Sequence, residues 1–480
     1  MNQAAHYETA LEDSIPVIQK VAYGIGMLAN QLFTAALSIF MVVLVNGLNM
    51  DPLYAGILGA APRIFDAITD PLMGYISDHT HSKWGRRRPY IIIGAIITGL
   101  SFIFMWQIHA ENSQMYNFIY FLCWSLVFYL GYTIFATPYI ALGYEMSNDF
   151  NERTRLMGSA QFIGQFAWVL APWFWVIIYN NKYFQSAPEG ARYLAVWVGI
   201  GCMIIGLLPA LICKERVISE DEQQKINFQD LMGEFRTFFH GIKTTFQCSP
   251  FLKLCGATFL IFNGFQTIAG LGWYIIVFYL FKGDYGTGGI PWPAWFGTIS
   301  ALCTMFLVIP VITFISKKIG KKGAFIISTL ISVIGYILKW WCFNPSNPWL
   351  MFLPLPLLSF GIGGLFTLMM SMTADVCDLD ELENNERREG MFGAVYWWMV
   401  KLGTAVAMFM FGFVLKYSGF QGDQAEQLTS TLNILRISDI VIPVVGALIA
   451  IIVIWSYDIT EEKAHSIKLE LEKRRSKTEE

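Results

Sequence analysis

Long apolar segments alternate with short polar ones along almost the whole chain. An α-helix needs about 20 apolar residues to cross the hydrocarbon core of a bilayer, and twelve segments have roughly this length. They fall at residues 21–46, 53–77, 89–109, 116–143, 157–180, 193–213, 251–281, 293–316, 323–343, 349–373, 392–416 and 437–457. The pattern therefore predicts an all-α membrane protein with twelve transmembrane helices.

One polar stretch is much longer than the others, and it separates six predicted spans from six. It covers residues 214–249 and begins Lys-Glu-Arg-Val. We therefore expect an N-terminal six-helix bundle at 1–213 and a C-terminal six-helix bundle at 250–457. The central loop 214–249 and the tail 458–480 should both be cytoplasmic.

Lys and Arg are distributed unevenly between the two sides that the spans define. If the N-terminus is cytoplasmic, most of the 33 Lys and Arg lie on that side. The opposite side receives only Lys182, Arg192, Lys282, Lys416 and Arg436. The positive-inside rule therefore predicts cytoplasmic termini in a multi-pass protein of the cell (inner) membrane.

Composition excludes several other classes of protein. Only 14% of the residues are charged, against about 25% in soluble proteins, and the net charge of −3 gives no basic excess for nucleic acid. The eight cysteines form no CxxC pair, and the six histidines lie in loops and termini. The sequence thus offers no disulfide framework, metal cluster or nucleophile–base pair. We expect no enzymatic activity and no cofactor.

Two loop motifs of the N-terminal half are repeated in the C-terminal half at nearly the same offset. Gly85 lies in the basic loop after the second predicted span and Gly320 in the basic loop after the eighth, and their numbers differ by 235. Asn-Glu-Arg follows the fourth and tenth spans from Asn151 and Asn385, which differ by 234. Two loops with nearly one offset predict a parallel duplication of six helices, the arrangement of major facilitator transporters.

The second predicted span carries three ionisable groups, and such groups at membrane depth are costly. Asp66 and Asp70 are one helical turn apart, Arg63 is a turn before them, and Thr69 can add a hydroxyl oxygen. Two adjacent carboxylates suit Na⁺, and they equally suit a proton, because repulsion and burial raise one pKa. The alternative is a structural network or gate in which Arg63 neutralises one acid.

Two lysines also fall within predicted spans. Lys401 is in the middle of the eleventh span, too deep to reach water easily. We therefore expect it to face a central cavity and to balance the charge of the two acids in the second span across that cavity. Lys339 is near the end of the ninth span and is expected to snorkel.

Aromatic rings stack on sugar faces and on amphipathic solutes, so some should line a substrate cavity near the membrane midplane. The candidates are Tyr23, Tyr132, Trp168, Trp273, Tyr396, Trp397 and Trp398.

Charged residues at the cytoplasmic ends of the spans are candidate gates. They mix acids with bases, which topology alone does not require. The expected gating residues are Arg63, Asp78, Arg86, Arg87, Arg88, Glu152, Arg153, Asp375, Asp378 and Arg387.

Several of these segments resemble the glycoside–pentoside–hexuronide:cation symporters, the melibiose-permease-like family of the major facilitator superfamily. The most specific segment is Arg-Ile-Phe-Asp-Ala-Ile-Thr-Asp-Pro at 63–71. Trp-Gly-Arg-Arg-Arg-Pro at 84–89, Gly-Tyr-Thr at 131–133, Arg-Arg-Glu-Gly at 387–390 and Lys401 add to it. The resemblance covers essentially the whole chain.

This resemblance implies a cation site formed by Asp66 and Asp70 with Thr133, with Thr69 at a position usually held by Asn. Lys401 matches the family lysine close to that site. The acid and the arginine that bind galactosides in the family are replaced here by Gln31 and Gln161. This change argues against a galactoside, although both amides can bond neutral hydroxyls. We expect Gln31, Tyr132, Gln161, Tyr396, Trp397 and Lys401 to line the substrate site between the halves.

The expected function is symport of a sugar, glycoside or uronide with Na⁺ or H⁺ by alternating access. The alternatives are the same fold carrying an amphipathic or lysolipid-like solute, or proton-coupled transport of the sucrose type. The expected partners are a small-molecule substrate, the coupling cation and the lipid bilayer, and the protein is expected to be a monomer.

Overall fold

The computed structural model describes residues 14–78, 80, 82–146, 150–215, 233, 236, 240–284, 290–384 and 389–478. Regular secondary structure in these residues is entirely helical, which confirms the all-α prediction. The helices of the N-terminal half are α1 (Val17–Asn46), α2 (Pro52–Asp78), α3 (Arg88–Met105), α4 (Gln114–Glu145), α5 (Phe150–Leu170), α6 (Phe174–Ile178) and α7 (Ala187–Ile212). Those that follow are α9 (Ser249–Tyr274), α10 (Trp292–Cys303), α11 (Ile309–Cys342), α12 (Leu355–Asn384), α13 (Glu389–Ser418), α14 (Thr429–Trp455) and α15 (Glu461–Thr478).

Four short segments of other helix types continue or precede these helices. The segments η2 (Ala171–Trp173) and η6 (Pro348–Phe352) are 3₁₀-helices. The segments η4 (Ile275–Leu280) and η5 (Thr304–Val308) are π-helices. The segment η4 forms the end of the expected span 251–281, and η5 lies inside the expected span 293–316. Hydropathy alone did not predict these changes of helical pitch.

Ten helical segments of the described chain are long and apolar enough to cross a membrane. The expected count of twelve differs from this for two reasons. Helix α2 is missing from the ten because its embedded charges lower its hydropathy. The segment Trp292–Cys342 counts once, although Gly320 breaks it with φ 75° and ψ 166°. With α2 added and that segment divided at Gly320, the helices correspond to the twelve expected spans.

Contacts divide the chain into two compact units. One comprises Met1–Val43 with Ile68–Phe235, and the other Leu44–Ala67 with Arg236–Glu480. The change near 235 falls inside the expected central loop, and the segment Leu44–Ala67 belongs to the second unit. The first part of helix α2, up to Ala67, therefore belongs to the second unit, and the rest of α2, from Ile68, belongs to the first unit.

In the first unit α3 packs against both α4 and α7. Glycines allow the close approach, because a Cβ on Gly94 would collide with the backbone of Phe135 in α4. Gly99 and Gly199 likewise bring α3 and α7 together. Small residues at such contacts are the usual means of packing helices in lipid, where the hydrophobic effect does not drive association.

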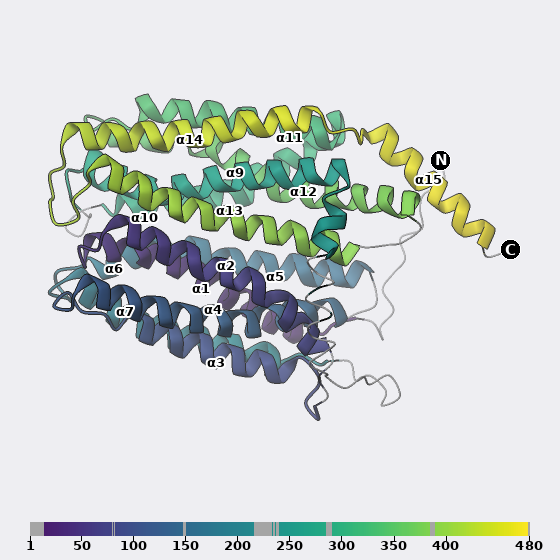
Figure 1. Ribbon diagram of the computed structural model, residues 1–480, viewed down its shortest axis with the longest axis horizontal. Helices are drawn as coiled ribbons and strands as arrows, with labels where there is room; N and C mark the ends of the chain where they lie inside the picture. The colour runs from purple at the N-terminus through teal and green to yellow at the C-terminus, as the bar shows by residue number, and fades with distance from the viewer. Residues whose placement is uncertain are drawn as a thin grey trace. The chain divides into compact units, whose positions relative to one another are not determined.

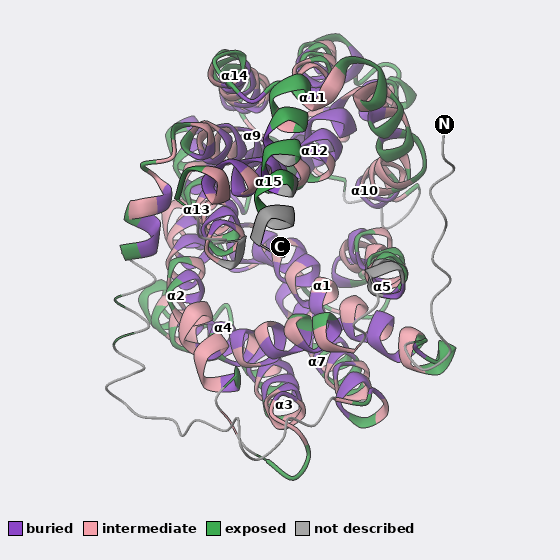
Figure 2. Cartoon of the chain, turned by 90° about the vertical axis from the view of Figure 1, so that its right-hand side faces the viewer, coloured by how far each residue is buried: buried purple, intermediate pink, exposed green. Residues whose placement is uncertain are grey.

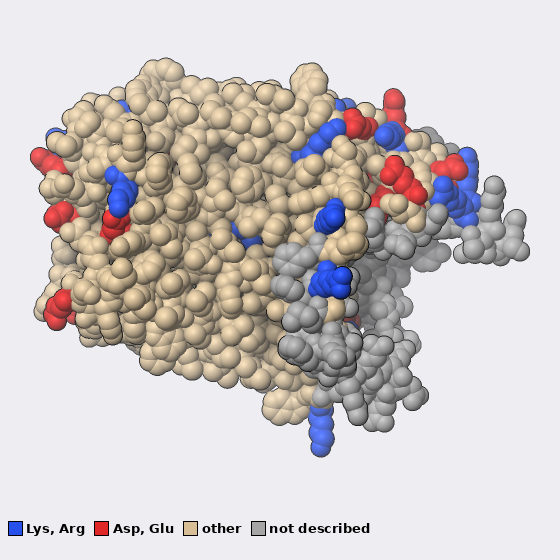
Figure 3. All heavy atoms as spheres, viewed as in Figure 1, with Lys and Arg blue, Asp and Glu red and all other residues tan. Residues whose placement is uncertain are grey.

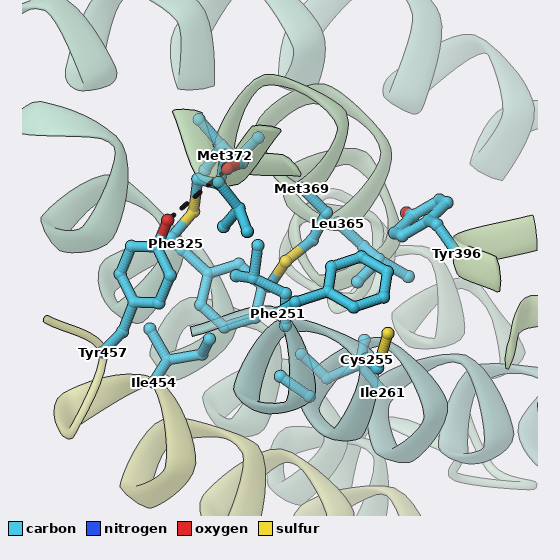
Figure 4. Packing of buried hydrophobic residues seen from close by; sticks show 14 of the residues in the cluster. Phe251, Cys255, Ile261, Phe325, Leu365, Met369, Met372, Tyr396, Ile454 and Tyr457 are labelled. Atoms are coloured by element: carbon cyan, nitrogen blue, oxygen red, sulfur yellow. Dashed lines mark hydrogen bonds between the residues drawn. The ribbon is translucent and has the colours of Figure 1, made fainter. Parts of the chain in front are cut away.

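In the second unit α9 contacts α12, α13 and α14, and these helices run alongside one another in Figure 1. A large apolar cluster fills the space among them. Figure 4 shows Phe251 and Cys255 of α9 near Tyr396 of α13, with Leu365 and Met369 of α12 close by. The same cluster extends to residues of α14 and α15.

The described chain ends in a helix that the apolar pattern did not predict. Figure 2 shows α15 largely exposed, yet Ile467 and Leu471 on one side of it are buried in the apolar cluster. Arg474 donates to the carbonyl of Leu382 near the end of α12 (2.9 Å). The segment expected to be a plain tail thus holds a helix that packs against α12.

Charged side chains on the face in Figure 3 gather toward the ends of the helices, with mostly uncharged surface between them. This is the distribution expected of helices that cross a hydrocarbon layer.

Candidate functional site

Helix α2 positions two carboxylates one helical turn apart. Pro52 begins the helix, where its missing N–H costs nothing, and the turn geometry places Asp66 and Asp70 on one face. Asp66 is 3% exposed and forms an ion pair with Lys401 of α13 (2.7 Å). Lys401 therefore neutralises the buried Asp66 carboxylate, as expected from the sequence.

The second carboxylate of this face, Asp70, accepts a hydrogen bond from a hydroxyl group. Thr133 of α4 donates to its carboxylate (3.1 Å), and the Thr133 and Thr69 hydroxyls are 3.1 Å apart. The structure thus brings together three of the four residues expected at the cation site. Their oxygens are the hard donors that Na⁺ prefers, and a carboxylate can equally hold a proton.

A second polar group lies on α1 and α5, where the family's charged pair is replaced by amides. Gln31 Nε2 donates to Gln161 Oε1 (3.3 Å), and Trp168 Nε1 donates to Gln31 Oε1 (2.9 Å). Tyr132 donates to the carbonyl of Asn30 (3.3 Å), so it lies against the same helix. These contacts join three of the residues expected to line the substrate site and contain no charged group.

The two aromatic candidates on α13 differ in accessibility. Trp397 is 47% exposed, whereas Tyr396 is fully buried in the apolar cluster shown in Figure 4. The Tyr396 side chain is therefore not available to a solute in this conformation, and we leave it out of the proposed lining. The two residues are adjacent, so the aromatic pattern alone could not tell which one faces outward.

The loop between α2 and α3 is tied to three acids of the first unit. Arg86 pairs with Glu145 at the end of α4, and Arg87 contacts both Glu145 (2.6 Å) and Asp78 (2.9 Å). The backbone N–H groups of Arg86 and Arg87 donate to Glu215 (2.9 and 3.0 Å). Burial raises the pKa of Glu215, against the lowering effect of these N–H groups. The expected gating residues of this loop therefore do form a network.

The corresponding loop of the second unit is built in the same way. Lys321, which follows Gly320, pairs with Asp375 of α12 (2.6 Å), as Arg86 after Gly85 pairs with Glu145. Both glycines have positive φ, 96° and 75°. The repeat inferred from the loop sequences is thus present in the backbone and in the ion pairs.

The last basic residue of each run binds the end of its unit's last long apolar helix. Arg88 donates to the carbonyl of Ala210 in α7, and Lys322 donates to that of Tyr457 after α14 (2.9 Å). These carbonyls lie at helix C-termini, where a cation is favourable.

Glu152 lies in a separate contact at the start of α5. Lys20 pairs with it (2.6 Å), and the Ile15 N–H donates to it (2.8 Å). Burial raises the pKa of Glu152, but these hydrogen bonds outweigh that effect and lower the pKa below its usual value.

Three further gating candidates give less information. The side chain of Arg153 and the whole of Arg387 lie outside the described residues. Asp378 lies in α12 three residues after Asp375, with its side chain partly buried.

One charged pair was missed by sequence reasoning. Lys339 of α11 and Asp439 of α14 pair with one another, each with a side chain 2% exposed. The prediction that Lys339 snorkels is wrong, because it has a buried partner. The only signal was an acid close to the start of the last predicted span, 100 residues further along the chain.

The chain is similar to known transport proteins over nearly its whole length. A model of the family described as MFS/sugar transport protein matches residues 22–461. The chain is 26% identical to an uncharacterized symporter of Bacillus subtilis, with 96% of each chain covered. It is 23% identical to a glucuronide carrier protein homolog of Escherichia coli, with 95% of each covered. It is 24% identical to a sodium-dependent lysophosphatidylcholine symporter of Danio rerio, with 96% of this chain and 90% of the relative covered.

The fold also matches solved structures. A bacterial homolog of the human lysosomal transporter Spinster superimposes with a TM-score of 0.65 at 16% identity, covering 92% of this chain and 97% of the other. At this identity the likeness shows the fold alone.

Proposed function

The chain belongs to the MFS/sugar transport protein family, whose glycoside–pentoside–hexuronide branch its helix-two motif resembles, and on this premise we propose that it couples a cation gradient to symport of a sugar, glycoside or uronide by alternating access. Members of this family are membrane transporters and not enzymes, which agrees with the many apolar helices.

The face of α2 with Asp66 and Asp70 is the observation that carries the proposal. Asp66 pairs with Lys401, and the Thr133 hydroxyl donates to Asp70. Two carboxylates on one face of a membrane helix, with hydroxyl oxygens beside one of them, form a site at which a small cation can bind. Binding of that cation would lower the cost of burying Asp70, and this difference can favour one conformation over another.

Either Na⁺ or H⁺ fits this arrangement. Asp70, Thr133 and Thr69 offer oxygen ligands to Na⁺, and a proton would neutralise the same carboxylate. The ion is therefore part of the test.

The amide residues Gln31 and Gln161 support an uncharged or acceptor-rich polar substrate. Hydroxyl-rich solutes bind through such groups. The relative from Escherichia coli is named as a glucuronide carrier protein homolog, which supports a glycoside or uronide.

A lysolipid is the second candidate cargo. The relative from Danio rerio is named as a sodium-dependent lysophosphatidylcholine symporter and matches nearly the whole chain. Loss of the charged galactoside pair at Gln31 and Gln161 is compatible with such an amphipathic solute.

The test begins with a thermal-shift screen of the purified protein. The probes are methyl β-D-glucoside, methyl β-D-glucuronide and lysophosphatidylcholine, each with and without Na⁺ and over a range of pH. Uphill uptake and counterflow of the best probe are then compared in vesicles with Asp66→Asn or Asp70→Asn.

We expect either substitution to abolish uphill uptake, because coupling needs the buried charge, while counterflow persists. Asp51→Asn is the matched control, since Asp51 precedes the same helix but pairs with the exposed Lys416 (2.6 Å). Concentrative uptake by both helix-two variants would show that these acids are structural.

A further inference from the structure

Three side chains of the first unit form a hydrogen-bond relay with a defined direction. Trp168 Nε1 donates to Gln31 Oε1 (2.9 Å), and Gln31 Nε2 donates to Gln161 Oε1 (3.3 Å). An indole N–H can only donate. The atom of Gln31 that faces Trp168 must therefore be its oxygen.

This fixes both amides, whose oxygen and nitrogen atoms would otherwise be interchangeable. Because its oxygen accepts from Trp168, Gln31 directs its NH₂ group to Gln161. The Gln161 side chain must then accept this hydrogen bond with its oxygen. The remaining atom of Gln161 is then Nε2. Among the described residues this nitrogen has no hydrogen-bond partner, and the side chain is exposed.

The backbone holds the relay in place. Gly164 of α5 is buried against α1, where a Cβ would lie 2.8 Å from Gln31 Nε2. Helix α5 thus approaches Gln31 more closely than any other residue at 164 would allow. The relay also lies within apolar spans, where polar groups facing lipid are costly. Both observations favour a built polar site over a chance surface contact.

We propose that Trp168 is a positioning residue that directs the Gln161 NH₂ group toward the transported solute. The site then selects a hydrogen-bond acceptor at this point, such as a ring, glycosidic, carboxylate or phosphate oxygen. This inference rests on the proposed function and adds which side of the hydrogen bond the protein supplies.

Three substitutions separate the parts of the relay. Trp168→Phe removes the N–H and keeps a ring. Gln161→Leu removes the terminal donor. Gln161→Glu keeps an oxygen for Gln31 but turns a second oxygen, instead of the NH₂ group, toward the solute.

Affinities for methyl β-D-glucoside and methyl β-D-glucuronide are measured by calorimetry. We expect Trp168→Phe to weaken binding about 3- to 10-fold, the size of one hydrogen bond. Gln161→Glu should weaken it more than Gln161→Leu, most of all for the anionic glucuronide. Gln161→Leu should cost less in the Trp168→Phe background than in the native protein, because the two residues act in series.

Trp175→Phe is the matched control. Its indole N–H donates to the backbone carbonyl of Ile39, also in helix α1 (3.0 Å). This hydrogen bond ends on the backbone and does not orient a glutamine side chain. Binding should change less than twofold. Additive effects of Trp168→Phe and Gln161→Leu, or native affinity in Gln161→Glu, would overturn the relay.

Different outcomes contradict the proposed substrate class and the proposed hydrogen-bond relay. If only lysophosphatidylcholine binds, the sugar proposal fails, and the same order of variants is measured with that lipid, whose phosphate is an acceptor. If no probe binds, the thermal stabilities of the ligand-free variants decide. The relay requires that the stability losses of Trp168→Phe and Gln161→Leu are not additive, because the two side chains are joined through Gln31. Additive stability losses would reject the relay.

Discussion

The buried pair of Lys339 and Asp439 shows how much a single charge depends on its partner. Two charges in hydrocarbon are tolerated because each neutralises the other, whereas one charge alone is costly. Lys339 lies three residues before the end of α11 and has a long side chain. Asp439 lies deeper in α14 and has a short one. The two residues are therefore not equivalent.

We predict that Lys339→Met destabilises the protein by about 3–5 kcal/mol, because it leaves the Asp439 carboxylate without a counter-charge. Asp439→Leu should cost less, since the lysine can extend toward the interface. The double variant should be close to native stability. Thermal unfolding in detergent measures all three.

Lys416→Met provides the comparison for this series, because the Lys416–Asp51 pair is much more exposed. It should cost less than about 1 kcal/mol. Equal losses for the two single variants and the double variant would show that the pair does not act through mutual neutralisation.

At the scale of elements, each of the two basic loops contains a glycine with positive φ, but the surroundings of the two glycines differ. Gly85 and Gly320 both have positive φ, which an L-residue adopts only at a cost. At Gly85 an added Cβ would also strike the Glu215 carboxylate, which accepts backbone N–H groups at the start of α3. At Gly320 the nearest atom belongs to Glu461, at 3.3 Å.

Gly85→Ala should therefore destabilise the protein more than Gly320→Ala, for which we expect about 1–3 kcal/mol from backbone strain alone. In a Glu215→Ala background the extra cost at position 85 should disappear. Melting temperatures of the four variants test this. Equal costs in the native background would mean that Glu215 moves aside freely.

Much of this architecture could be predicted from the sequence, because hydropathy sets the spans and the loop glycines set the repeat. The relation of Asp66 to Lys401 was predictable because both charges are buried in spans and each needs a partner. The Lys339–Asp439 contact was not, since no local pattern joins residues so far apart. The burial of Tyr396 was also not predictable, because aromatic residues occur on every face of these helices.

At the scale of the whole molecule, the duplication extends to contacts beyond the loops. Arg192 of α7 donates to the carbonyl of Ile108 (3.3 Å), and Arg436 of α14 donates to that of Trp340 (2.8 Å). In each unit an arginine near the start of the last long apolar helix thus binds the end of α3 or α11. The repeated loops should then face the same side of the membrane.

We predict that single cysteines at positions 82 and 316, in a variant without the native cysteines, are labelled by a membrane-impermeant maleimide from the same side. From the excess of Lys and Arg near both loops, we propose that this side is the cytoplasm. A cysteine at Lys182 should be labelled from the opposite side. Labelling of positions 82 and 316 from opposite sides would contradict the parallel duplication.

The Lys339–Asp439 pair breaks this duplication, and that break has a consequence for synthesis. By the loop offset Lys339 corresponds to Phe104, and by the paired arginines Asp439 corresponds to Ala195. The N-terminal half therefore has no charge pair at the equivalent positions of α3 and α7. In the C-terminal half the lysine emerges 100 residues before its acid, which is about 5–20 s of translation. During that interval Lys339 must reach toward the interface, and α11 settles at its final depth only after α14 has been made.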